Sequence, residues 1–150
     1  MEKIYKYLND KLEKGEKLQK LKPEINELMD DEICEYCKKN AIYNEGYNRI
    51  KLNEYSNEKF EIIIICWNDK AETKIHDHPE KGCILYLFEG ELEETKYNKD
   101  MKFIQKTVVY SKSISYMDNK IGFHKIKCNS KALSIHIYSP PNHKMKIMNL

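Results

Sequence analysis

Two histidines separated by one residue, His76 and His78, are the feature of the sequence most suited to chemistry. On an extended strand, side chains two positions apart project from the same face, as two ligands of one metal ion must. Asp77, between them, should point to the opposite face, so we do not expect it to be a ligand. His124 lies in the strand-like segment IGFHKIKC, which a β-barrel can place beside the pair. Imidazole binds zinc, copper, iron and nickel, so these residues predict a metal site without identifying the metal.

Arg49 is the only arginine among the 26 basic residues, all the others being lysine. A guanidinium group can grip a carboxylate through two parallel hydrogen bonds, which an ammonium group cannot do. Tyr47 precedes Arg49 by two positions and therefore shares its face of any strand. The simpler alternative is a solvated surface arginine.

The segment LSIHIY alternates apolar residues with Ser134, His136 and Tyr138. This period of two puts the polar side chains on one face of a strand and the apolar ones on the other. In a barrel, the polar face would look into the lumen, toward the metal. The alternative is an edge strand with one wet face.

Cys34 and Cys37 form a CxxC pair, which can indicate a redox or zinc motif. They lie in a predicted helix with no second pair nearby, so we expect ordinary helix cysteines. With 5 cysteines in the chain and no secretory signal in its first residues, we expect reduced thiols and a cytoplasmic protein.

The composition is that of an ordinary soluble globular protein, with 150 residues, 41% hydrophobic and 33% charged, and a net charge of +2. Lysines are dispersed among acidic residues, so no nucleic-acid footprint is present. The longest apolar run, residues 62–67, is far shorter than the roughly 20 residues that a bilayer requires. We therefore expect a single domain over 1–150, acting as a monomer on a small molecule, without nucleic-acid or membrane partners.

Residues 1–40 carry helical signals and are predicted to form a helical cap. Ile4, Leu8 and Leu12 recur at helical spacing. Pro23 is predicted to open a second helical stretch.

From residue 43 to 141 the pattern changes to short β-rich segments separated by turn residues. Turns are predicted at Glu89-Gly90 and Asn129-Ser130, among other positions. Many short strands at this spacing indicate an antiparallel sandwich or a small barrel. The expected fold is therefore an all-β barrel with an N-terminal helical cap. The predicted strand segments are IKL, KFEIIIICW, CILYLF, ELEETKY, MKFIQKTVVY, IGFHKIKC and LSIHIY.

The segment HDHPEKGCILYLFEG is similar to the first cupin motif, in which two histidines precede a glutamate and then a glycine. Gly90 matches the glycine, but Cys83 stands at the glutamate position. His124 matches the histidine of the second cupin motif, where Asn119 and Cys128 replace the expected proline and asparagine. These departures occur together in one branch of the superfamily.

The sequence resembles cysteine dioxygenase, of the thiol dioxygenase branch of the cupins, from about Tyr43 to Pro141. The resemblance implies a small jelly-roll cupin β-barrel and Fe(II) held by three histidines. The matching segments are YNR at 47–49, KFEIIIICW at 59–67, IHDH at 75–78, GELEETKY at 90–97, SYMDNKIGFH at 115–124 and SIHIYSPP at 134–141.

The same resemblance implies a role for each candidate side chain. The metal ligands would be His76, His78 and His124. Tyr47 and Arg49 would face the metal, with Arg49 taking the substrate carboxylate. Ser134, His136 and Tyr138 would form a hydrogen-bonded chain that ends beside the substrate.

The resemblance also implies features of the segment that follows Tyr138 and of Cys83. Ser139–Pro140 would be a cis peptide bond, and Met145 would line the substrate entrance. Cys83 follows His78 by five positions, and some cysteine dioxygenases join the residues at these positions in a thioether. We therefore predict that Cys83 and Tyr138 can be linked; the alternative is a small buried apolar cysteine.

The expected activity is oxidation of L-cysteine by O2 to cysteine sulfinate at Fe(II). The alternatives are dioxygenation of 3-mercaptopropionate or another small thiol, and a non-catalytic metal-binding cupin module. A zinc hydrolase or isomerase is a further class, because zinc also accepts three histidines with one open position.

Overall fold

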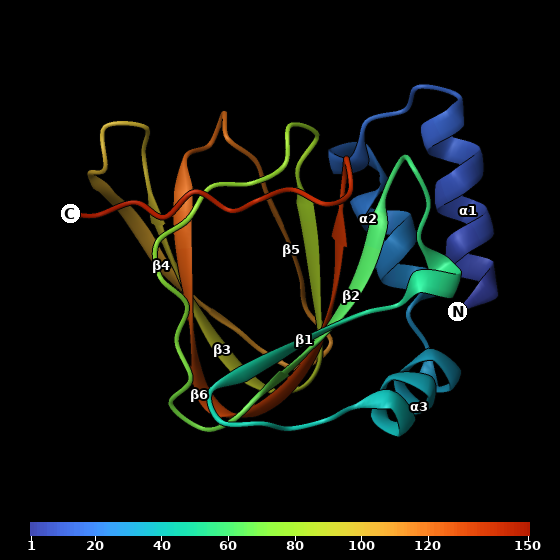
Figure 1. Cartoon of the computed structure of the whole chain (residues 1–150), viewed down its shortest axis with the longest axis horizontal. Coiled ribbons are helices and arrows are strands. Elements are labelled where there is room, and N and C mark those ends of the chain that lie inside the picture. Colours follow the sequence, from blue (N-terminus) through green and yellow to red (C-terminus); the bar gives the residue numbers. More distant parts are fainter.

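The computed structural model describes all 150 residues. Three N-terminal helices precede a set of antiparallel strands (Figure 1). The helices are α1 (Glu2–Glu13), α2 (Leu18–Leu28) and α3 (Asp31–Asn40), with a short 3-10 helix η1 (Asn53–Tyr55) after the first strand. The strands are β1 (Tyr47–Lys51), β2 (Glu61–Trp67), β3 (Cys83–Tyr97), β4 (Phe103–Val109), β5 (Ile114–Met117) and β6 (Phe123–Tyr138).

The strands form one sheet in the order β1-β2-β6-β3-β4, with β5 paired to β3 beside this path. The end strands β1 and β4 are not hydrogen-bonded to each other, so the sheet is curved but unclosed. Figure 1 shows the sheet curling round on itself, with the helices on the side of β2. The two long strands β3 and β6 lie next to each other at the centre of the order and carry much of the site.

The apolar run of β2 is buried on both faces of the sheet. Ile62 and Ile64 pack with the helices in one apolar cluster. Ile63 and Ile65 face the opposite way and pack with Trp67 in a second cluster inside the curve of the sheet. A strand covered on both faces reads as a continuous hydrophobic segment rather than an alternating one.

Two predicted turns, at Glu89-Gly90 and Asn129-Ser130, are wrong. β3 and β6 continue through these positions as strands of 15 and 16 residues. The pairing of β3 with β6 is irregular on both sides of Glu89. Gly90 has a φ of +92°, and a Cβ there would lie 2.3 Å from the carbonyl oxygen of Lys131. The glycine therefore marks a bulge where two backbones approach closely, not the end of a strand.

The prediction that Pro23 opens a helix is also wrong, because α2 begins at Leu18 and contains Pro23. Pro23 and Gln19 are both exposed. Proline has no N–H to donate to the carbonyl oxygen of Gln19, four residues earlier in the helix. Water can solvate that oxygen instead. The helical placement of Cys34 and Cys37 in α3 is confirmed. All five cysteines are unpaired.

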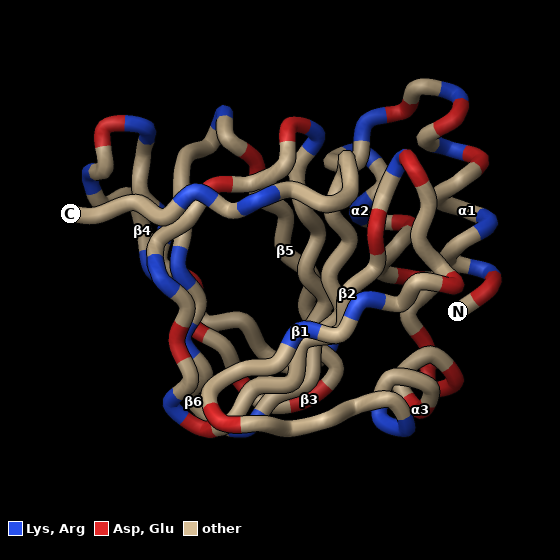
Figure 2. Tube along the Cα trace, in the orientation of Figure 1, with Lys and Arg blue, Asp and Glu red and all other residues tan.

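Basic and acidic residues lie interspersed along the helices and turns (Figure 2). No large stretch of the trace carries charges of only one sign. None of the three helices has the length and apolar character needed to cross a bilayer.

Candidate metal centre and substrate pocket

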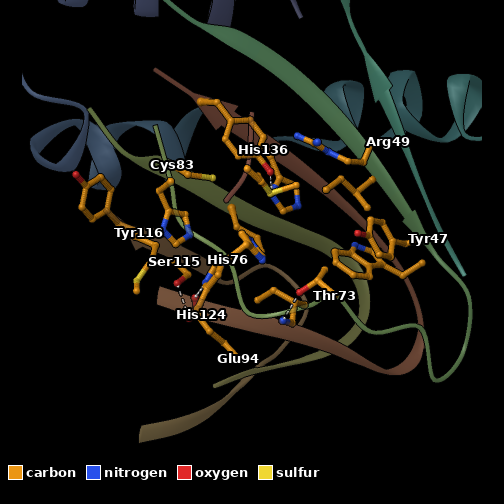
Figure 3. Close-up of a pocket in the computed structure, with 18 residues that line it drawn as sticks. Tyr47, Arg49, Thr73, His76, Cys83, Glu94, Ser115, Tyr116, His124 and His136 are labelled. Carbon is orange, nitrogen blue, oxygen red and sulfur yellow. Dashed lines mark hydrogen bonds and ion pairs between the residues drawn. The ribbon is translucent and has the colours of Figure 1, made fainter. Parts of the chain in front are cut away.

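Three buried histidines, His76, His78 and His124, converge inside the curve of the sheet. Each offers one ring nitrogen, and these three atoms lie within 4.8 Å of one another. His76 and His78 lie in the loop between β2 and β3 rather than in a regular strand, and His124 is the second residue of β6. Figure 3 shows His76 and His124 facing each other in the pocket.

The backbone holds each of these histidines in place. His76 and His124 form an antiparallel bridge, with N–O distances of 3.0 and 3.3 Å. Asn119 clamps His78 by accepting from its backbone N–H at 2.9 Å and donating to its carbonyl oxygen at 2.8 Å. Asn119 stands where the second cupin motif has a proline, and this clamp was not predicted.

Hydrogen bonds at the outer ring nitrogens orient two of the imidazoles. Nδ1 of His76 donates to the carbonyl oxygen of Lys74 at 2.7 Å. Nδ1 of His124 lies 2.6 Å from Oε2 of Glu94, whose other oxygen accepts a hydrogen bond from Ser115 at 3.0 Å. These contacts leave the Nε2 atoms of both histidines free to face the centre. A carboxylate or carbonyl behind the ring is the usual arrangement around a metal-binding histidine.

His78 gives the clearest sign that the cluster holds an ion. Its side chain is buried, and neither of its ring nitrogens has a hydrogen-bond partner. Buried polar atoms are rarely left unpaired, because losing water without a replacement is unfavourable. Nε2 of His76 lies 3.1 Å from Nε2 of His124. Two nitrogens bound at right angles to one ion at usual lengths would be about 3.0 Å apart, so the donor set fits a divalent metal.

The electrostatics favour neutral imidazoles at His76 and His78. Burial and the neighbouring His124 lower the pKa of His76 to about 4. The same causes lower the pKa of His78 further below its usual range. Burial opposes ionisation of Glu94, but the hydrogen bond and charge of His124 outweigh it and leave the pKa of that carboxyl lowered. Neutral imidazole is the form that binds a metal.

A small pocket surrounds the three histidines. Its lining includes six other residues singled out from the sequence, Tyr47, Arg49, Cys83, His136, Tyr138 and Met145. The cavity volume is about 30 Å³, enough for about two water-sized molecules.

A chain of polar groups runs from the core of the sheet to the pocket. Nε1 of Trp67 donates to Oγ of Ser134 at 2.8 Å, and that hydroxyl lies 2.8 Å from Nε2 of His136. Since the indole can only donate, the Ser134 proton is free to point to Nε2, which puts the ring proton on Nδ1. Nδ1 of His136 is 3.4 Å from the hydroxyl of Tyr138. Trp67 is a member of this chain that the sequence reasoning missed.

Arg49 lies at the mouth of the pocket on β1 and is exposed. Its guanidinium carbon is 5.3 Å from the centroid of the Tyr138 ring. The Tyr47 ring packs on Trp67, with ring centroids 5.1 Å apart. The Arg49 guanidinium is thus held beside the face of the Tyr138 ring, with part of the guanidinium open to solvent.

Cys83 and Tyr138 are direct cross-strand partners on β3 and β6. Both side chains line the pocket, and burial raises the pKa of both the thiol and the phenol. The cis Ser139–Pro140 bond implied by the resemblance is present.

Asp77 does not belong to the histidine cluster. Its Oδ1 instead accepts hydrogen bonds from Nε2 of His143 at 2.9 Å and from the backbone N–H of Lys146 at 2.7 Å. As expected, it faces away from the metal-binding atoms. Its contacts with the C-terminal segment were not predicted.

The sequence profile described as cysteine dioxygenase type I matches residues 7–149. The chain belongs to this family. Cysteine dioxygenase type 1 of Danio rerio is 33% identical over 105 residues, which is 63% of this chain and 52% of that protein. The Homo sapiens protein of the same name is 32% identical over 99 residues, covering 60% of this chain and 50% of its own length. The chain thus spans about half the length of the curated cysteine dioxygenases it matches.

Solved structures of similar shape confirm the small cupin fold with N-terminal helices. A cupin superfamily protein from Desulfitobacterium hafniense has a TM-score of 0.54 at 10% identity, covering 66% of this chain and 82% of its own. A mutant of Bacillus subtilis oxalate decarboxylase has a TM-score of 0.58 at 13% identity, covering 71% of this chain and 29% of its own. At these identities the likeness concerns the fold alone.

Proposed function

We propose that this protein is an iron(II)-dependent dioxygenase that oxidises L-cysteine with O2 to cysteine sulfinate. The observation that supports this most is the buried, unpartnered imidazole of His78, in a chain whose residues 7–149 match the cysteine dioxygenase type I family. The reaction adds both oxygen atoms to the sulfur (RSH + O2 → RSO2H) and needs no further co-reactant.

We assign His76, His78 and His124 as the metal ligands. Three neutral imidazoles contribute no charge, and three ligands leave coordination positions for other groups. Iron(II) bound there would lower the pKa of a substrate thiol and supply the redox chemistry with O2. No carboxylate joins the ligand set, since Cys83 replaces the glutamate of the general cupin motif and Glu94 lies behind His124.

Arg49 is the group suited to the substrate carboxylate. It lines the same pocket as the histidines, and its fork can form paired hydrogen bonds with two carboxylate oxygens. Contact with the Tyr138 ring restricts where the guanidinium can point. The side chain is exposed, so this contact contributes less than a fully shielded ion pair would.

Tyr138 is suited to act as a proton donor beside the substrate. Burial raises the pKa of its hydroxyl, so the phenol keeps its proton at neutral pH. The run of Trp67, Ser134 and His136 fixes that hydroxyl from behind. A group preorganised in this way loses little freedom when the substrate binds.

3-Mercaptopropionate is the second candidate substrate, and one observation keeps it in view. The only carboxylate that lines the pocket is Glu94, which already accepts hydrogen bonds from Ser115 and lies against His124. No free acidic side chain is therefore available for the amine of cysteine. 3-Mercaptopropionate has no amine and therefore needs no such partner.

Metal analysis followed by oxygen-uptake assays tests the proposal. Protein loaded anaerobically with iron(II) should consume one O2 per cysteine and yield cysteine sulfinate, while zinc-loaded protein should be inactive. 3-Mercaptopropionate and cysteamine, assayed in parallel, rank the thiols. Iron binding at full stoichiometry without oxidation of any thiol would instead indicate a metal-binding module, and hydrolysis by zinc-loaded protein would indicate a hydrolase.

A further inference from the structure

The residues that follow the cis Ser139–Pro140 bond run across the end of the curved sheet, over the pocket. In Figure 1 this C-terminal segment passes beside the loop that joins β2 and β3. We call residues 142–148 the strap. Its side chains alternate, with His143 and Met145 half-buried and Lys144 and Lys146 exposed. Met145 reaches the lining of the pocket.

The strap is paired with the loop that carries the candidate metal ligands. The backbone N–H of Asp77 donates to the carbonyl oxygen of Lys146 at 3.1 Å, and that of Met148 donates to the carbonyl oxygen of Ile75 at 2.8 Å. His76 forms an isolated antiparallel bridge with Ile147 while it also pairs with β6. The strap is therefore paired, through its backbone, with the loop segment that carries the candidate ligand His76.

The carboxylate of Asp77 completes this attachment. A single oxygen, Oδ1, accepts both the backbone N–H of Lys146 at 2.7 Å and Nε2 of His143 at 2.9 Å. The Asp77 side chain is 15% exposed, so water competes little for these bonds. At its beginning the strap is held independently, because Asn142 donates its N–H to Glu61 at 2.9 Å and accepts from Lys51 at 2.9 Å.

The size of the pocket indicates why the attachment matters. Its volume of about 30 Å³ holds about two water-sized molecules, and a free amino acid thiol is larger than that. Cysteine must therefore extend from the histidines to the mouth at Arg49, and a bulkier thiol must in addition displace part of the wall. The strap forms part of the pocket wall. It is held by few backbone hydrogen bonds and is half-exposed, which are the properties of a segment that opens locally.

We propose that Asp77 is a positioning residue that ties the strap over the metal pocket, and that the tied strap limits the size of the thiols that bind there. Only the identity of the thiols rests on the proposed function. This role is consistent with the position of Asp77 between His76 and His78. The loop then carries two candidate ligands on one face and the attachment point of the strap on the other. Any thiol too bulky to fit between the histidines and the mouth at Arg49 has to break this tether.

The test compares Asp77→Ala with Asp77→Asn, which keeps the accepting oxygen, and with Asp100→Ala, an exposed aspartate in the turn after β3. Hydrogen exchange of backbone amides in 142–150 is measured on iron(II)-loaded protein without oxygen. Exchange should be about tenfold faster or more in Asp77→Ala, from the loss of two hydrogen bonds, and close to the parent in the other two variants. All should keep one metal per chain.

The same anaerobic proteins are titrated with cysteine and with the bulkier N-acetylcysteine. In Asp77→Ala the affinity for N-acetylcysteine relative to cysteine should rise severalfold, whereas Asp77→Asn should keep the parent ratio. His143→Ala, which leaves Asp77 in place, should shift both measurements in the same direction and serves if Asp77→Ala does not fold.

Unchanged exchange in 142–150, or loss of the metal from Asp77→Ala, would overturn the tethering role. Faster exchange with an unchanged thiol ratio would overturn the size limit. If the parent binds no thiol at all, the proposed function fails, while the exchange measurement still decides whether Asp77 holds the strap.

Discussion

Oε2 of Glu94 lies 2.6 Å from Nδ1 of His124 in the buried wall of the pocket. In the ladder between β3 and β6, Lys96 pairs with His124, and Glu94, two positions away, shares its face of the strand. The cupin motif loses its glutamate ligand at Cys83. A carboxylate nevertheless remains at the centre, placed behind a histidine instead of on the metal.

Replacing Glu94 with glutamine should weaken metal binding by about 10- to 100-fold, because His124 loses the charged partner that orients it and raises its basicity. The dissociation constant for cobalt(II) or iron(II) at pH 7 measures the effect. Ser115→Ala is the matched control, since it removes only the hydrogen bond to the other Glu94 oxygen and should change the affinity much less. Equal affinities in Glu94→Gln and the parent would show that the contact is structural only.

Arg49→Lys should reduce kcat/KM for cysteine and for 3-mercaptopropionate by about tenfold or more, which corresponds to ~1.4 kcal/mol of transition-state stabilisation. Lysine keeps the charge but lacks the planar fork that matches a carboxylate. Cysteamine has no carboxylate and serves as the internal control, for which the loss should be small. Similar losses on all three thiols would assign Arg49 a structural role, through its contact with the Tyr138 ring.

The metal-free protein should become less stable as the pH falls below the usual histidine range. His76 has a pKa lowered from 6.5 to about 4, with burial as the main cause, and burial also lowers the pKa of His136. Between the two values the unfolded chain binds more protons than the folded one, so the free energy of unfolding decreases with decreasing pH. At pH 5 the loss is up to about 2 kcal/mol for each such histidine.

Urea denaturation of metal-free protein at pH 7.5 and pH 5 measures this dependence. His136→Gln, whose side chain does not titrate, should lose less stability between the two pH values than the parent does. Equal stability at both pH values, or higher stability at pH 5, would mean that these imidazoles are charged in the folded protein.

The pairing of His76 with His78 was accessible from the sequence because their spacing requires no tertiary information. Their side chains reach the same cluster even though both residues lie in a loop rather than in a regular strand. His136 and Tyr138 both line the pocket, as the alternation of side chains along β6 predicts. In both cases local backbone geometry decides where the side chain points.

The role of Glu94 could not be read from the sequence in this way. Its contact with His124 depends on the register between β3 and β6, and that register shifts around Glu89 and Gly90. A slip of one residue would turn Glu94 to the opposite face. The predicted turn at Glu89-Gly90 cut β3 in two and concealed this register. Asp77 and Asn119 were missed for a related reason, since their partners are distant in the chain and are brought close only by the fold.

We predict that Cys83 and Tyr138 become joined by a thioether during aerobic turnover with iron. They are direct cross-strand partners, and both side chains line the pocket beside the three histidines. The new bond joins Sγ to the ring carbon beside the hydroxyl and replaces one S–H and one C–H bond. The two hydrogens leave as protons with two electrons, which O2 accepts. The linked phenol would be held in position toward the substrate.

Intact mass after repeated turnover should fall by about 2 Da relative to protein kept without iron, and peptide mapping should place the loss at Cys83 and Tyr138. Cys128→Ala is the matched control, because Cys128 is buried and unpaired like Cys83 but pairs with Leu92 rather than Tyr138 across the strands, so this variant should still lose the mass. Cys83→Ala should keep its mass and remain partly active, because the hydrogen bond from His136 still orients Tyr138. A mass that stays constant through many turnovers of the parent would show that Cys83 acts only as a small buried side chain.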